Sequence, residues 1–103
     1  MTDIYRALAD PHRRRILQML SQQERTQSEL VSAFPISQPA TKKHITILKE
    51  EDLIKERKQG KFVYYSLNES VYQLHFQMLK REMELVLDDK LRNLKHYLEK
   101  GEG

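Results

Sequence analysis

The side chains best suited to chemistry in this chain of 103 residues are amides, hydroxyls and ammonium groups gathered between residues 37 and 49. No carboxylate interrupts them until Glu50. Amide and ammonium groups can bond the edges of base pairs, and hydroxyl and ammonium groups can also bond phosphates. The stretch therefore favours a surface that contacts DNA. The candidate contacts are Ser37, Gln38, Lys42, Lys43 and Thr46.

A helix over residues 37–54 would present these groups. Ser37 can cap it, and Pro39 fits its first turn, where a missing N–H costs little. Apolar spacing predicts a narrow buried stripe opposite the polar face, formed by Thr41, Ile45 and Leu48. An ordinary surface helix with a solvated lysine face would look the same in isolation, so the neighbouring elements must decide.

The segment before this helix predicts three further helices. Residues 1–9 form a short one, and Asp10-Pro11 ends it and begins a second over residues 11–22. Thr26 and Glu29 have the spacing of a capping box, which opens a third helix that Pro35 ends. Only two residues then separate the third helix from Ser37. Two helices joined by so short a connection predict a helix-turn-helix.

After residue 54 the apolar period changes from 3.6 to 2. Residues 54–58 and 61–67 predict two strands, and Gln59-Gly60 between them is a hairpin signal. The tip is basic, and a hairpin of this kind directly after a helix-turn-helix is a wing. A solvated polar turn is the alternative for the tip taken alone. The predicted wing contacts with DNA are Arg57, Lys58 and Lys61.

From about residue 70 to residue 100 the pattern is helical again. Its apolar surface is broader than packing on so small a domain requires, so part of it should meet a second copy of the chain. The alternative is that the whole surface folds back on the same domain. The first helix is expected at the same interface. The predicted dimerisation residues are Ile4, Tyr5, Leu8, Leu79, Met83, Leu87, Leu91 and Leu94.

Composition limits the classes of function. The chain has room for one domain, residues 1–103, and it is too polar for a membrane span, so a cytoplasmic protein with no membrane insertion is expected. Residues 1–67 hold 12 Lys and Arg against 8 Asp and Glu, whereas residues 68–103 hold 6 against 7. The positive part coincides with the predicted DNA-contacting elements. The chain has no cysteine, no glycine-rich phosphate loop and no recognisable catalytic triad, so we expect no catalytic residues and no cofactor.

The order of these elements resembles that of the ArsR/SmtB family of bacterial repressors. The residues that carry the resemblance are Leu8-Ala9-Asp10-Pro11, Arg13-Arg14, Ile16-Leu17, Ser37-Gln38-Pro39-Ala40, His44-Ile45, Leu48, Leu53-Ile54, Gly60-Lys61 and Val63-Tyr64-Tyr65-Ser66-Leu67. The resemblance covers nearly the whole chain. It implies a mostly α winged helix-turn-helix with a small β-hairpin, in the order α-α-α-α-β-β-α, that acts as a homodimer. It also implies that Gln38, Lys42 and Lys43 face the major groove.

Two departures from the family pattern matter. Many relatives have a small hydroxyl residue at Lys42 and histidine at Lys43, so the preferred operator can differ. Relatives that bind metal use cysteines or ligands on the last helix. Here His96 and Glu99 match half of such a site, but Met83 and Leu85 stand where the other half belongs, so no metal site is expected. His44 is interpreted as a packed or capping histidine rather than a ligand.

The leading hypothesis is therefore a transcriptional regulator, expected to be a repressor, that binds an inverted-repeat operator in double-stranded DNA as a homodimer. The alternative is a winged-helix module that contacts proteins and no longer reads DNA. An enzyme is the weakest class. An unknown inducer or protein partner that releases the DNA stays open.

Overall fold

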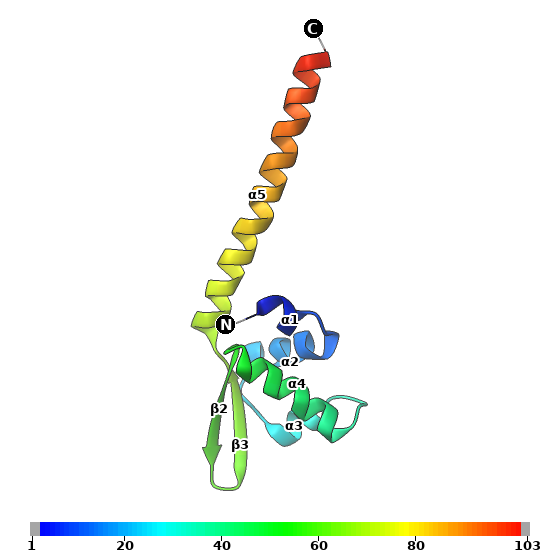
Figure 1. Ribbon diagram of the computed structural model, residues 1–103. Helices are drawn as coiled ribbons and strands as arrows, with labels where there is room; N and C mark the ends of the chain where they lie inside the picture. Colours follow the sequence, from blue (N-terminus) through cyan, green and yellow to red (C-terminus); the bar gives the residue numbers. More distant parts are fainter. Residues whose placement is uncertain (1–2, 102–103) are drawn as a thin grey trace. The chain divides into compact units, whose positions relative to one another are not determined.

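The computed structural model describes residues 3–101 and divides the chain into two units, residues 1–72 and 73–103. In the first unit, short helices surround one face of a small sheet (Figure 1). The second unit is the greater part of one long helix. No helix among residues 3–101 is both long enough and apolar enough to cross a membrane.

The first two helices begin at aspartate caps, as the sequence predicts. Helix α1 runs over Ile4–Leu8, and the Asp3 side chain accepts the Arg6 backbone N–H. Helix α2 runs over Pro11–Gln22, and Asp10 Oδ1 accepts the N–H groups of His12 and Arg13 at 2.7 and 3.3 Å. These carboxylates satisfy donors that a helix start leaves unpaired. Residues 1 and 2, which the sequence assigns to the first helix, lie outside the described residues.

Helices α3 (Gln27–Ser32) and α4 (Gln38–Glu50) form the helix-turn-helix. The capping box at α3 is present in full, because Thr26 Oγ1 accepts the Glu29 N–H at 3.1 Å and Glu29 accepts the Thr26 N–H at 3.2 Å. Ser37 caps α4 by accepting the Ala40 N–H at 3.2 Å. Both helix starts thus follow from local hydrogen bonds that residue types and spacing predict.

The predicted end of α4 is wrong, because the helix stops at Glu50 rather than near Ile54. Asp52 takes a left-handed φ of 57°, and the N–H groups of Asp52 and Leu53 turn back to the carbonyls of Lys49 and Leu48. This is the Schellman pattern, which usually has glycine at the left-handed position. Aspartate adopts that conformation less readily than glycine, so the stop at Glu50 has no clear signal in the sequence.

The wing hairpin is part of a three-stranded antiparallel sheet rather than an isolated pair. Strands β2 (Ile54–Gln59) and β3 (Phe62–Leu67) form the hairpin, and β1 (Arg25–Thr26) pairs with the other side of β3, in the order β1-β3-β2. The sequence-based element order therefore missed one strand, which is only two residues long. The turn is Gly60-Lys61, one residue later than predicted. Gly60 has a positive φ of 61°, whereas the φ of Lys61 is not positive, as in a type II′ turn.

The core of the first unit lies between α2, α4 and the sheet. The stripe predicted for α4 is confirmed, since Thr41, Ile45 and Leu48 are almost fully buried. Tyr65 is buried from β3, with Val63 and Leu67 packed beside it, so this row of the strand faces the core. The other core residues are Ala7, Ile16, Leu17, Met19, Leu20, Leu30, Leu53 and Ile54.

Helix α5 runs over Glu69–Gly101, close to the predicted bounds. Within the second unit its apolar side chains are largely exposed. The exposed fraction is 61% for Met83, 62% for Leu87 and Leu91, and 51% for Leu94, whereas Leu79 is half-buried. A helix with so many exposed apolar side chains has a face that a partner could cover.

Candidate nucleic-acid interface

The outer face of α4 presents the polar residues that the sequence singles out. The side chains of Gln38, Lys42, Lys43 and Thr46 are exposed, while the intervening stripe is buried. Residues 38, 42 and 46 are four apart, so they lie in one row along the helix, with Lys43 beside that row. The helix thus offers two ammonium groups and an amide to a ligand without exposing its apolar side.

The two hydroxyls on this face have structural hydrogen bonds. Ser37 Oγ accepts the Ala40 N–H as the cap of α4, and Thr46 Oγ1 donates to the Lys42 carbonyl at 3.0 Å. Each oxygen keeps a second site for a ligand. Gln38, Lys42 and Lys43 therefore carry most of the free hydrogen-bonding capacity of this surface.

The wing presents two of its three predicted cations freely to solvent. Lys58 lies on β2 and Lys61 lies in the turn, and both are exposed. The Lys61 ammonium stands 5.7 Å from the ring centroid of Phe62, whose side chain is 49% exposed at the tip. A flexible ammonium at a turn suits phosphate contacts, which do not depend on base identity.

The third cation, Arg57, is bound within the chain. Its guanidinium forms a fork with the Glu24 carboxylate, at 2.6 Å from Nη2 and 3.4 Å from Nε, and it lies 4.4 Å from the centre of the Tyr64 ring. The hydrogen bond to Glu24 raises the pKa of Arg57. Glu24 is a residue that sequence reasoning missed, because nothing local relates positions 33 apart.

A second ion pair joins the wing to α4. Lys49 near the end of α4 pairs with Glu56 on β2, and this hydrogen bond raises the pKa of Lys49. Residues 49 and 56 thus connect the two elements expected to contact DNA. Because it is paired with Glu56, Lys49 is not a free cation of this surface.

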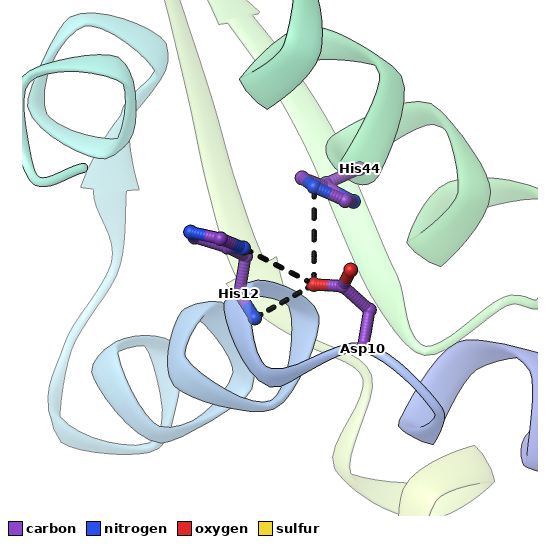
Figure 2. A group of neighbouring side chains, drawn as sticks. All are labelled: Asp10, His12 and His44. Carbon is purple, nitrogen blue, oxygen red and sulfur yellow. Dashed lines mark hydrogen bonds and ion pairs between the residues drawn. The ribbon is translucent and has the colours of Figure 1, made fainter. Parts of the chain in front are cut away.

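Asp10, His12 and His44 meet where the start of α2 faces α4 (Figure 2). His12 Nδ1 and His44 Nε2 lie 3.4 and 3.8 Å from Asp10 Oδ1, and the two imidazoles lie with ring centroids 5.5 Å apart at 14°. One carboxylate and two imidazoles can form a zinc site. Here, however, Asp10 Oδ1 already accepts two backbone N–H groups as a helix cap.

A guanidinium also opposes metal binding at this cluster. Arg13 Nη1 lies 3.0 Å from His44 Nδ1 and can only donate, so it requires an unprotonated Nδ1. A metal on Nε2 would instead require a proton on Nδ1. The structure therefore supports the reading of His44 as a packed, hydrogen-bonded histidine.

Burial lowers the pKa of His44 below its ordinary value. Asp10 acts in the opposite direction, while the nearby Arg13, His12 and Lys43 add to the lowering. Burial alone would raise the pKa of Asp10, but the N–H bonds from His12 and Arg13, together with His44, lower it overall. The cluster thus pairs an ionised carboxylate with a neutral His44 near pH 7.

A helix-turn-helix followed directly by a basic hairpin, the wing, is the arrangement of winged-helix DNA-binding proteins. Residues 10–56 match the family model for bacterial regulatory proteins of the arsR family. The chain is 38% identical over 73 residues to the transcriptional repressor SdpR of Bacillus subtilis, covering 71% of this chain and 81% of SdpR.

Two further comparisons agree with this result. The chain is 36% identical to the transcriptional repressor SmtB homolog of a Synechocystis species, covering 81% of this chain but 60% of that relative. The crystal structure of an ArsR family transcriptional regulator matches with a TM-score of 0.71 at 34% identity, over 80% of this chain and 90% of that one. The chain belongs to the ArsR family of bacterial regulators, and it is a DNA-binding transcriptional regulator.

Proposed function

We propose that the chain is a homodimeric repressor that binds an inverted-repeat operator, with the N-terminal half of α4 in the major groove and the wing on the flanking backbone. The observation that carries this proposal is the division of α4 into a buried stripe and an exposed row of Gln38, Lys42 and Lys43. Lysine suits guanine O6 and N7, and glutamine suits adenine N6 and N7.

The wing supports the same arrangement. Lys58 and Lys61 are exposed at its tip, and the Lys49–Glu56 ion pair ties the hairpin to α4. In this proposal the wing lysines contact phosphates and fix the register of α4 in the groove. Ser37, Thr46 and Arg57 are secondary contacts, since each already has an intramolecular hydrogen bond.

Dimerisation is proposed through the apolar side chains of α5, joined by Ile4, Tyr5 and Leu8 of α1. The exposed side chains of Met83, Leu87, Leu91 and Leu94 support it. Two linked copies bind two half-sites at high effective concentration, so half-sites about 34–36 Å apart would be read together. The 103 residues would then form one DNA-binding domain with dimerisation helices.

Repression needs affinity and register but no chemistry, so the proposal includes no catalytic residue and places the protein in the cytoplasm, where its DNA is. The names of SdpR and the SmtB homolog support repression rather than activation. A winged-helix module without DNA readout is not favoured by family membership.

Selection of bound duplexes from a random pool, using the purified chain, tests the proposal directly. The expected result is an enriched inverted repeat with half-sites about one helical turn apart. Recovery of duplexes without a common sequence would contradict sequence-specific binding, and recovery of a single half-site would contradict the dimer.

The assignment of the groove face is tested with Lys42→Ala and Lys43→Ala, and with Lys80→Ala on α5 as an exposed control. Each groove variant should lose about 1–3 kcal/mol of discrimination between the selected duplex and a scrambled one, because a lysine–base contact is lost. The control should bind like the parent. Parental discrimination in both groove variants would show that another face reads the bases.

A further inference from the structure

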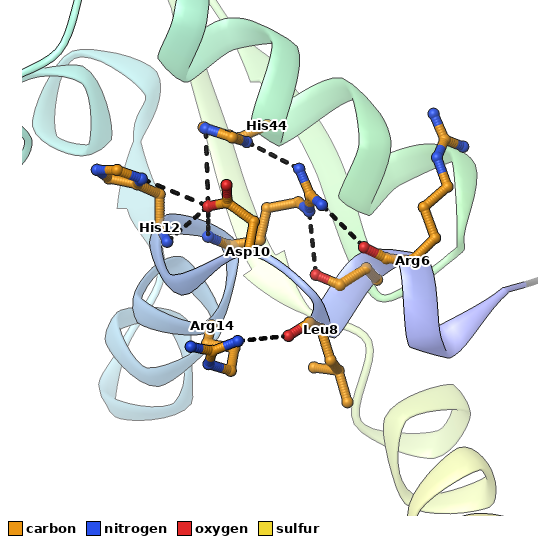
Figure 3. A network of polar contacts seen from close by, with 8 residues as sticks. Arg6, Leu8, Asp10, His12, Arg14 and His44 are labelled. Carbon is orange, nitrogen blue, oxygen red and sulfur yellow. Dashed lines mark hydrogen bonds and ion pairs between the residues drawn. The ribbon is translucent and has the colours of Figure 1, made fainter.

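The Arg13 guanidinium is surrounded by acceptors from two other helices. Figure 3 labels Arg6 and His44, which supply two of these acceptors. Nε donates to the Ala7 carbonyl at 3.0 Å and Nη2 donates to the Arg6 carbonyl at 2.8 Å, both in α1. Nη1 donates to His44 Nδ1 at 3.0 Å, in the middle of α4. One side chain of α2 thereby joins the end of α1 to the DNA-facing helix.

The contact with His44 depends on its protonation state. Arginine has five donors, no acceptor and a permanent charge, so the imidazole nitrogen must accept. A neutral His44 with its proton on Nε2 satisfies Arg13 on one side and faces Asp10 on the other. A doubly protonated imidazole would set an N–H against the Arg13 N–H and add a second positive charge beside it.

The groups facing His44 are few. Asp10, His12 and Arg13 face it from the start of α2, and Lys43 is its charged neighbour on α4. Asp10 is the single anion among them, and its Oδ1 is shared with two backbone N–H groups and His12. A shift of Oδ1 toward a charged His44 would therefore loosen the cap of α2.

A second set of contacts ties α1 to the far end of α4. The Glu51 side chain is buried and accepts from Arg6 Nη1 at 3.4 Å and from the Asp3 backbone N–H. The middle of α4 is therefore held by Arg13 of α2, and its end is held against α1. A helix fixed at two points keeps its axis, whereas one fixed at the end alone can tilt.

We propose that Arg13 is a positioning residue for operator recognition, which holds α4 at its reading angle through neutral His44, so that protonation of His44 releases the helix and reduces sequence discrimination. The proposal rests on the placement of α4 in the major groove. Phosphate contacts tolerate a tilt of the helix better than bidentate base contacts do, because base contacts demand strict geometry.

The readout is the ratio of dissociation constants for a scrambled duplex and for the operator obtained by random-pool selection, measured by fluorescence anisotropy at constant ionic strength. Arg13→Lys keeps the charge, but its single nitrogen cannot span the three acceptors that the planar guanidinium reaches with three nitrogens. It should lower this ratio about tenfold near pH 8, with the scrambled-duplex affinity nearly unchanged. Arg14→Lys is the matched control, because Arg14 is the next residue of α2 and donates only to the Leu8 carbonyl among the contacts described.

The pH dependence of this ratio distinguishes a positioning role of Arg13 from a purely structural one. Acidification in steps from pH 8, as far as the parent chain stays folded, should lower its ratio once His44 gains a proton. Because burial lowers the pKa of His44, this fall is expected below the ordinary range of histidine. His44→Asn supplies a side-chain oxygen that can accept from Arg13 and cannot titrate, so its ratio should stay nearly constant over the same range. Circular dichroism checks that each variant is folded.

Each outcome decides the proposal. Loss of discrimination in Arg13→Lys but not in Arg14→Lys, with a pH-independent His44→Asn, supports it. Equal ratios in the parent and both arginine variants, or a parallel fall of the parent and His44→Asn on acidification, overturns it. If Arg13→Lys does not fold, the pH comparison alone decides. A parent chain that never prefers the operator contradicts the groove placement instead.

Discussion

The guanidinium of Arg57 has two anionic partners available, the Glu24 carboxylate within the chain and a phosphate on bound DNA. A phosphate that took the place of Glu24 would leave that carboxylate unpaired beside the DNA backbone. While the pair holds, Glu24 occupies the arginine, and in the proposed complex its own charge repels the backbone. We therefore expect Glu24 to keep Arg57 from a phosphate contact and to reduce the affinity of the wing for any duplex.

Glu24→Gln should therefore tighten binding to operator and scrambled duplex alike. One more phosphate contact would steepen the dependence of log affinity on log salt by about 0.9. The measurement is anisotropy over a salt series. The same substitution in an Arg57→Gln background is the control, and it should leave the slope unchanged. An unchanged slope in the single variant would mean that Arg57 does not reach the backbone.

Thr41 has a buried hydroxyl at the start of α4. Its side chain is fully buried, and Oγ1 finds no hydrogen-bond partner among the described residues. Thr41→Val removes that hydroxyl while keeping the branched shape, so it should raise the free energy of unfolding by about 1 kcal/mol.

Urea unfolding measures this change, and Thr46→Val serves as the comparison. Thr46 is exposed and donates to the Lys42 carbonyl, so its valine variant should gain nothing. A loss of stability in Thr41→Val would show that its hydroxyl has a partner after all.

At the scale of elements, the wing should supply affinity rather than sequence preference. Replacing Lys58 and Lys61 together by alanine should weaken binding to operator and scrambled duplexes by the same factor and reduce the salt slope by about two units. A matched pair of substitutions, Lys80→Ala with Lys90→Ala on α5, controls for the loss of net charge. A changed sequence preference with an unchanged slope would assign base contacts to the wing.

Elements whose signals are local could be predicted from the sequence. Three helix starts could be predicted from capping residues that bond N–H groups two or three positions away, namely Asp10, Thr26 and Ser37. Alternation of apolar residues predicted strand β3, and Gly60 marked the wing turn to within one residue. The exposed polar row of α4 followed from its periodicity.

Features that depend on distant partners could not be predicted. Strand β1 exists because Arg25 and Thr26 pair with Tyr65 and Tyr64, and two residues carry no strand pattern of their own. The contacts of Glu24 with Arg57 and of Arg13 with His44 join residues more than thirty positions apart. The end of α4 was missed because an aspartate occupies a position where glycine is the usual signal.

For the whole molecule, the proposed dimer makes a direct prediction. Leu87→Glu places a carboxylate on the exposed apolar side of α5, which costs little in a monomer and several kcal/mol if a second copy buries it. Sedimentation should show dissociation, and operator affinity should fall with it.

Gln77→Glu on the same helix is the control, because position 77 is already polar and exposed. It should sediment as the parent does. A parent chain that sediments as a monomer at micromolar concentration and still binds a full inverted repeat tightly would remove α5 from the interface.

The strand order has a consequence for how the protein behaves in concentrated solution. Because β1 pairs with one side of β3, β2 is left as the long outer strand of the sheet, with a row of backbone groups that lack a neighbouring strand within it. Such an edge is a template for association with other chains. Residues 55–58 read Lys-Glu-Arg-Lys and are all exposed, so a strand approaching this edge would have to desolvate charges of both signs. The wing cations that we propose as DNA contacts, Arg57 and Lys58, therefore also oppose growth of the sheet into aggregates.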